Sequence, residues 1–97
     1  MEPTFTLKST VERWKGKAAW HFMTISIEIS EQIKAFNEMP RRGFGAVAVE
    51  AKIGNTAWKT SIFPEKKGTY VLPVKSDVRK KEQISSGDKV EVMITLQ

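Results

Sequence analysis

The sequence predicts a mainly β protein, a small closed or split β-barrel of about six or seven strands with two short helices. Apolar and polar residues alternate with a period of two along most of the chain, which is the pattern of strands with one face in a core. Glycine, proline and asparagine separate the alternating stretches, and helix-start signals occur only twice. The length of 97 residues predicts a single domain over residues 1–97 with one core.

Two strands are predicted near the beginning of the chain. Residues 5–13 alternate regularly and predict the first strand, and a turn is expected over residues 14–17. Residues 20–29 predict the second strand, with Trp20 and Phe22 on one face and a row of Met and Ile side chains on the other. Because both faces carry large apolar groups, we expect either two covered faces or a bulge near Phe22.

A short helix is predicted to follow the second strand. Ser30 is suited to the N-cap position because its hydroxyl can accept from an amide of the first turn, and Glu31 complements the helix dipole. Ile33 and Phe36 lie three positions apart and therefore share one face. Pro40 disfavours helical geometry at the preceding residue, so the helix is expected to end at about residue 38.

The middle of the chain predicts a β-hairpin. Residues 46–53 alternate, and Gly54 and Asn55 form a two-residue turn of the kind that glycine permits because it tolerates positive φ. Residues 56–63 predict the returning strand, which is expected to stop at Pro64 because proline has no amide proton for a ladder.

A second strand–helix–strand unit is predicted after the hairpin. Residues 70–74 predict a strand in which Pro73 marks an edge position or an unpaired amide. Ser76 and Asp77 are expected to cap a short helix that ends at about residue 82. Residues 89–96 alternate most regularly of all and predict the last strand. The two strand–helix–strand units have the same order, which favours two similar halves closing one barrel.

Part of the second unit resembles the swapped-hairpin unit of AbrB- and MazE-type proteins. The matching residues form a strand that ends in proline and lysine (70–75), a short basic helix (78–80) and a Gly-Asp turn into the last strand (87–92). The resemblance implies an AbrB-like double-split barrel in which one chain supplies two similar halves and works as a monomer.

Most of the chain from Trp20 onward also resembles a bacterial family of unknown function. That family is found alone or N-terminal to the YdeI/OmpD-associated (bacteriocin-protection) domain. The resemblance extends over roughly four fifths of the chain. The matching blocks within it are Trp20 and Phe22, residues 42–47, residues 58–64 and residues 72–92. The resemblance implies the barrel fold and assigns no activity.

Composition narrows the classes of function. The chain has no cysteine, which excludes a disulfide framework, a thiolate metal site and a cysteine nucleophile, and which fits a cytoplasmic location. We expect no secretory signal and no membrane insertion, because the longest apolar runs are far too short to span a bilayer. Sixteen Lys and Arg residues against eleven Asp and Glu give a net charge of +5. These charges are spread in short groups, which favours a role in solubility over a nucleic-acid footprint.

Catalysis, metals and cofactors are not expected. His21 is the only histidine and has no cysteine to complete a transition-metal site. Both aspartates, Asp77 and Asp88, have capping or turn roles to explain them, and neither a nucleophile elbow nor a phosphate-binding loop occurs. The sequence therefore predicts a non-enzymatic protein without a cofactor.

The candidate function is the binding of a small molecule that is anionic or contains a ring. Trp20, Trp58 and Tyr70 would supply an aromatic platform for the ring, and basic and hydroxyl side chains would hold the anion. The alternative is that the aromatic groups simply fill the core. The candidate ligand-binding residues are Arg42, Trp58, Lys59, Ser61, Tyr70, Lys75 and Arg79.

Two other partners are considered. By analogy with AbrB, a nucleic-acid-binding domain would use basic residues at two loop–helix ends as phosphate contacts. Those residues are Arg41, Arg42, Arg79, Lys80 and Lys81. The third hypothesis is an accessory domain that binds another protein.

Overall fold

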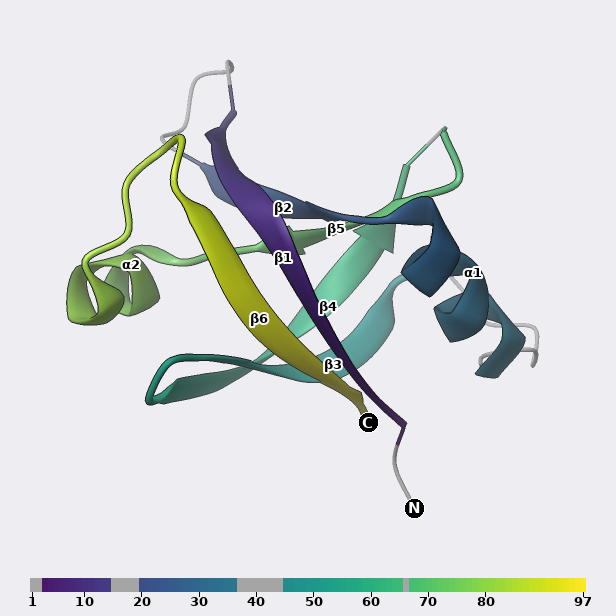
Figure 1. The fold of residues 1–97 in the computed structure, drawn as a ribbon. Helices are drawn as coiled ribbons and strands as arrows, with labels where there is room; N and C mark the ends of the chain where they lie inside the picture. The colour runs from purple at the N-terminus through teal and green to yellow at the C-terminus, as the bar shows by residue number, and fades with distance from the viewer. Residues whose placement is uncertain (1–2, 15–19, 37–44, 66) are drawn as a thin grey trace.

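The computed structural model describes residues 3–14, 20–36, 45–65 and 67–97. Six strands and two helices follow one another along the chain (Figure 1). They are β1 (Thr4–Arg13), β2 (His21–Ile25), α1 (Ile27–Phe36), β3 (Val47–Ile53), β4 (Thr56–Pro64), β5 (Tyr70–Pro73), α2 (Ser76–Glu82) and β6 (Lys89–Leu96). The predicted turn at 14–17 and the predicted sites at Arg41 and Arg42 lie largely or wholly outside the described residues.

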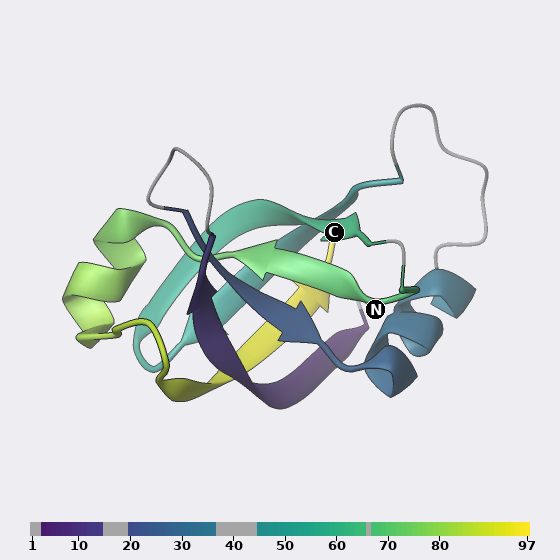
Figure 2. The same cartoon turned by 90° about the horizontal axis from the view of Figure 1, so that it is seen from above.

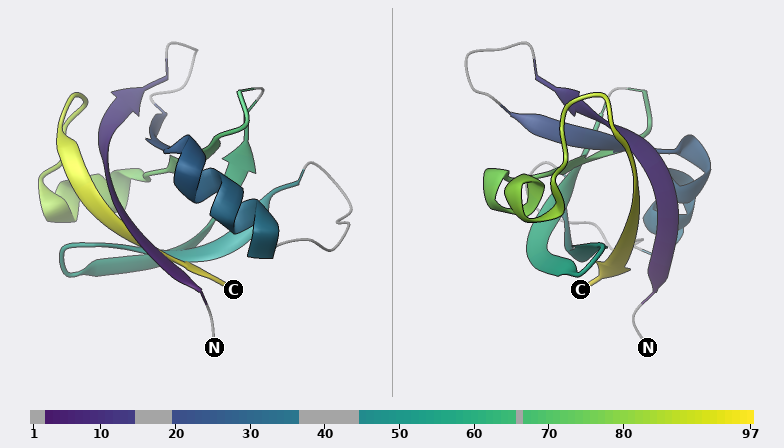
Figure 3. Two further views of the ribbon diagram at one scale, coloured as in Figure 1. Left: turned by 45° about the vertical axis from the view of Figure 1, so that its right-hand side comes forward. Right: turned by 60° about the vertical axis from the view of Figure 1, so that its left-hand side comes forward.

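The six strands form one closed antiparallel barrel in the order β1-β2-β5-β4-β3-β6. Helices α1 and α2 lie at opposite ends of the barrel (Figure 1 and Figure 2). The views in Figure 3 also show the two helices separated by the strands. The predicted mainly β barrel with two short helices is therefore confirmed.

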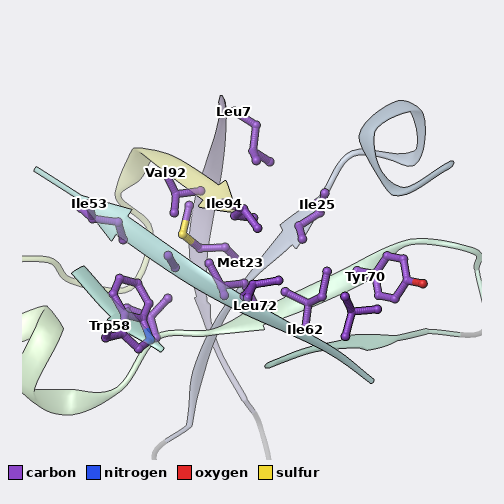
Figure 4. Packing of buried hydrophobic residues seen from close by; sticks show 14 of the residues in the cluster. Leu7, Met23, Ile25, Ile53, Trp58, Ile62, Tyr70, Leu72, Val92 and Ile94 are labelled. Carbon is purple, nitrogen blue, oxygen red and sulfur yellow. The ribbon is translucent and has the colours of Figure 1, made fainter. Parts of the chain in front are cut away.

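Alternation along the strands places one face of each in the core. In β3 every second residue from Val47 to Ile53 is buried, while the residues between them are exposed. Its hairpin with β4 turns at Gly54, which has φ +57°, and Ile53 pairs with Thr56 as the two-residue turn predicts. Trp58 of β4 and Tyr70 of β5 lie towards opposite ends of the apolar cluster that fills the barrel (Figure 4).

The second predicted strand was too long, and the helix after it begins earlier than expected. β2 stops at Ile25, where its last pair with β5 joins Ile25 to Tyr70, so the residues beyond have no strand to pair with. Instead, the Ser26 hydroxyl accepts a hydrogen bond from the Ile29 amide at 3.3 Å, and the Ser26 carbonyl accepts from the Ser30 amide at 2.8 Å. Ser26 therefore has the capping role that was predicted for Ser30, which is buried inside α1.

The second helix has the predicted extent but a different start. Its N-cap position is Lys75, which makes no side-chain capping bond, and Ser76 and Asp77 belong to the first turn. Asp77 still lies near the positive end of the helix dipole. The helix ends at Gln83, whose left-handed conformation turns its amide back to the carbonyls of Arg79 and Lys80.

The two halves of the barrel have the same connectivity. Exchanging β1, β2, α1 and β3 with β4, β5, α2 and β6 reproduces every strand pairing of the barrel. Met23 and Leu72 face each other at the centre of the β2–β5 pair. The pairing of Ile25 with Tyr70 at one end has its counterpart at the other, where the Val74 amide donates to the His21 carbonyl at 2.9 Å.

Each half contains a place where its first two strands stop pairing. β1 pairs with β2 only through Val11–Arg13, and β4 pairs with β5 only through Phe63 and Pro64. We call the unpaired stretch beside each helix a split. The α1 split lies between residues 7–10 of β1 and residues 24–26, and the α2 split lies between residues 58–60 of β4 and residues 73–75.

Pro73 lies where the β4–β5 pairing is interrupted. The Val74 amide points towards β2, so the backbone nitrogen of the preceding residue points towards β4. That residue is proline, which has no proton to donate. Pro73 therefore has no amide proton to donate to β4, and along the α2 split β4 pairs with β3 but not with β5.

Candidate functional site

The α2 split contains an open pocket of about 330 Å³. Its walls come from the start of β2, the unpaired part of β4, and the segment that joins β5 to α2. The lining residues are Trp20, His21, Trp58, Lys59, Thr60, Pro73, Val74, Lys75, Ser76 and Arg79. The volume is at the lower end of the range for small-molecule sites.

Three basic side chains converge on this pocket. Arg79 is half-buried, and its Nε donates to the Val74 carbonyl at 3.2 Å, which fixes the guanidinium group at the base of the split. Lys59 and Lys75 are exposed and line the same pocket. None of the described lining residues is acidic. The pocket therefore has a concentrated positive charge that an anion can neutralise.

Two tryptophans form apolar walls. Trp58 is only 7% exposed and packs into the core, whereas Trp20 is 47% exposed. The Trp14 amide donates to the Trp20 carbonyl at 2.6 Å, and the Trp14 ring contacts Phe22 edge-on, so the backbone that carries Trp20 is held at both sides. A flat ring beside these walls would bury apolar surface.

The structure brings together four of the predicted ligand-binding residues. Trp58, Lys59, Lys75 and Arg79 all line the pocket. Ser61 is half-buried on β4 and is not among the lining residues. Arg42 lies outside the described residues.

Tyr70 does not belong to this pocket. It is buried at the other end of the barrel, where its amide donates to the Ser30 hydroxyl and the Lys34 ammonium lies 5.9 Å from its ring centroid. Burial raises the pKa of its hydroxyl above the usual 10.0. The predicted aromatic platform is therefore Trp58 and Trp20, without Tyr70.

The structure describes three of the five basic residues of the nucleic-acid hypothesis, and all three belong to α2. Arg79 turns into the α2 split, while Lys80 and Lys81 are exposed on α2. Arg41 and Arg42 lie outside the described residues.

Sequence reasoning missed the polar residues Ser76 and His21 as pocket-lining groups. Their meeting with β4 depends on the interrupted β4–β5 pairing, which sequence spacing alone does not reveal. Pro73 was the available signal, because a proline within a strand indicates a missing ladder bond beside it.

The α1 split is filled where the α2 split is open. The Ser9 hydroxyl donates to the Thr24 carbonyl at 2.7 Å and so bridges β1 to β2. The buried Ser30 hydroxyl donates to the Ile25 carbonyl at 3.2 Å and accepts from the Tyr70 amide at 3.1 Å. Protein groups thus satisfy one another in this split.

Residues 3–14, 20–36, 45–65 and 67–97 contain no group of three or more His, Asp or Glu side chains placed to hold a metal ion. Within the same ranges, neither helix has the length and apolar character needed to cross a membrane.

A family model supplies the classification of the chain. The model describes a domain of unknown function, DUF1905, and it matches residues 7–94. The chain belongs to this family. In this DUF1905 domain the match includes both splits, β2 to β5 in full and most of β1 and β6. No curated protein matches the chain. The predicted membership of a family of unknown function is confirmed, while association with the YdeI-type domain stays a prediction.

Proposed function

We propose that this DUF1905 domain is a non-enzymatic binding module for a small anionic ligand that contains a ring. The ligand occupies the pocket in the α2 split, with its anionic group near Lys59, Lys75 and Arg79 and its ring against Trp58 and Trp20. The observation that carries the proposal is the convergence of three cations on a pocket without a described acidic group.

The competing explanation is that these cations only aid solubility. Arg79 argues against it, because a side chain kept for solubility would extend into water. Instead Arg79 is half-buried and anchored by its Nε, which leaves the terminal nitrogens of the guanidinium group available to an anion.

We also propose that the two halves correspond to the two subunits that AbrB- and MazE-type proteins combine into one barrel. The reproduced strand pairings support this relation. It makes the chain a monomeric barrel, in which the two splits are free to differ because one sequence no longer serves both.

A thermal-shift screen with anionic metabolites tests the proposed function. A compound that binds only the folded state raises its stability, by about 2.7 kcal/mol when the free ligand is present at one hundred times its Kd. We expect at least one ring-containing anion to raise the melting temperature, and Arg79→Ala to remove most of that rise.

Lys8→Ala is the matched control. Lys8 is exposed on β1 and pairs with Glu91 of β6, as Lys59 of β4 pairs with Glu50 of β3, so the variant removes an equal charge beside the other split. It should leave the ligand response unchanged. If Lys8→Ala and Arg79→Ala weaken the response equally, net charge and not the pocket is responsible. A response only to nucleic acid would instead support the AbrB-like alternative.

A further inference from the structure

Trp58 offers the pocket a hydrogen-bond donor as well as an apolar wall. No described group accepts a hydrogen bond from its indole N–H, and no buried side-chain nitrogen or oxygen in the described residues lacks a partner. The N–H is therefore at the small accessible part of a side chain that is only 7% exposed and lines the pocket. A tryptophan N–H in such a position usually has an acceptor, and a ligand can supply it.

The charge of the pocket selects among anions. Lys59, Lys75 and Arg79 carry three positive charges, and no described lining residue carries a negative one. A monocarboxylate would neutralise only one of these charges. A phosphate monoester carries nearly two negative charges at neutral pH and has three acceptor oxygens, so it matches the basic groups and the indole N–H together.

The shape of the pocket limits what the phosphate is attached to. Trp20, Trp58 and Pro73 present apolar surfaces beside the basic groups, which suits a flat ring. A volume of about 330 Å³ accommodates one ring system and one phosphate more readily than a polymer.

From these features we infer that the ligand is a flat ring bearing a phosphate monoester. Its phosphate oxygens accept hydrogen bonds from the Trp58 indole N–H and the Arg79 guanidinium group, and its ring lies against Trp20. This inference rests on the proposed function and specifies the class of ligand for the same pocket.

Proton–nitrogen correlation spectra of the labelled protein test the inference directly. The indole signals of the three tryptophans are separate from the amide signals and can be assigned with Trp14→Phe, Trp20→Phe and Trp58→Phe. The probes are phenyl phosphate, phenol, benzoate and glycerol phosphate, titrated at about pH 7.5, where the phosphate is largely dianionic because its second pKa is about 6.

We expect phenyl phosphate to move the Trp58 indole proton downfield in a saturable manner and to shift the Trp20 signal. Trp14 does not line the pocket, so its signal should stay in place as an internal control. Phenyl phosphate should bind at least about tenfold more tightly than benzoate, which has no phosphate, or glycerol phosphate, which has no ring. Arg79→Lys keeps the charge but removes the planar fork, and it should weaken phenyl phosphate at least severalfold.

The outcomes separate this inference from the proposed function. If phenyl phosphate binds without moving the Trp58 indole signal, or benzoate binds equally well, the ligand class is wrong while the anion pocket stands. If none of the anionic probes binds, both proposals fall. A titration with adenosine monophosphate tests whether the phosphorylated ring is a nucleotide. Tighter binding than that of phenyl phosphate indicates a nucleotide, and equal or weaker binding indicates another phosphorylated ring.

Discussion

The α1 split and the α2 split occupy equivalent positions in the barrel, yet the first is filled and the second holds a pocket. The clearest difference is at one pair of helix residues. In α1 the hydroxyl of Ser30 donates to the carbonyl of Ile25, five positions earlier, and in α2 the guanidinium of Arg79 donates to the carbonyl of Val74, also five positions earlier. Both side chains donate to the equivalent backbone carbonyl. The serine side chain has no atoms beyond its hydroxyl, whereas the guanidinium group of Arg79 extends beyond Nε and lines the pocket.

The strand residues beside Ser30 and Arg79 also differ between the two splits. In the α1 split the Ser30 hydroxyl also accepts from the Tyr70 amide, and Tyr70 is buried over the split. The corresponding strand position in the other half is His21, which is only half-buried and lines the pocket. One backbone arrangement can therefore build either an end bridged by side-chain hydrogen bonds or an open pocket, depending on a few side chains beside the helix.

The largest expected effect comes from exchanging the two helix residues. Ser30→Arg should lower the free energy of unfolding by more than about 3 kcal/mol, because it forces a large charged side chain into a fully buried site. Arg79→Ser should lower it by less than about 1 kcal/mol, because it removes one partly buried hydrogen bond. Urea unfolding measures both values.

If Ser30→Arg does not fold, Ser30→Ala can be compared with Arg79→Ser instead. It removes both hydrogen bonds of the hydroxyl and leaves the Tyr70 amide without its acceptor, at an expected cost of about 1–3 kcal/mol. Equal costs for Ser30→Ala and Arg79→Ser would show that the two splits are sealed to the same degree.

A smaller difference is expected between the anchors of the two helices. Ile33 lies three positions after Ser30 in α1, and Glu82 lies three positions after Arg79 in α2. Ile33 is fully buried, so Ile33→Ala should cost about 2–5 kcal/mol. Glu82 accepts a hydrogen bond from the Thr56 hydroxyl at 2.6 Å, so Glu82→Ala should cost only about 1 kcal/mol.

The same urea measurements decide this second comparison. Thr56→Val removes the donor of the same hydrogen bond and serves as the control. The double variant should cost less than the sum of the two single variants, because both lose one shared hydrogen bond. A cost for Glu82→Ala as large as that for Ile33→Ala would mean that α2 is held as firmly as α1.

The smallest expected effect is a pH dependence at the sealed end. Burial raises the pKa of the Tyr70 hydroxyl, so the folded state keeps this proton to a higher pH than the unfolded state does. The associated stability is fully present below the usual pKa of 10.0 and is lost as the pH rises through the folded-state pKa. Tyr70→Phe should therefore show a shallower loss of stability than the wild type above pH 10.

Urea midpoints collected at a series of alkaline pH values test this expectation. Lysine deprotonation affects wild type and Tyr70→Phe alike, so their difference reports on Tyr70. Parallel profiles across the whole range would show that burial at this end does not bias the ionisation.

Sequence patterns predicted the barrel because its strands have one buried face. The alternation in β3 and β6, the turn at Gly54 and the proline at position 73 each report a local physical requirement: a buried face, a positive φ, or a missing amide proton. The error at residues 26–29 arose because alternating isoleucines fit a strand or a helix over so short a stretch. The helix formed there because β2 had no further partner.

By itself the sequence determined the β architecture, the two helices, and four residues that meet in the pocket: Trp58, Lys59, Lys75 and Arg79. Only the tertiary structure decided that Tyr70 lies at the other end, away from Trp20 and Trp58, and that Ser30 lies in one split while Arg79 lines the pocket of the other. Periodicity reports which face of a strand is buried. It does not report which strands meet, and a split exists only where two strands distant in sequence stop pairing.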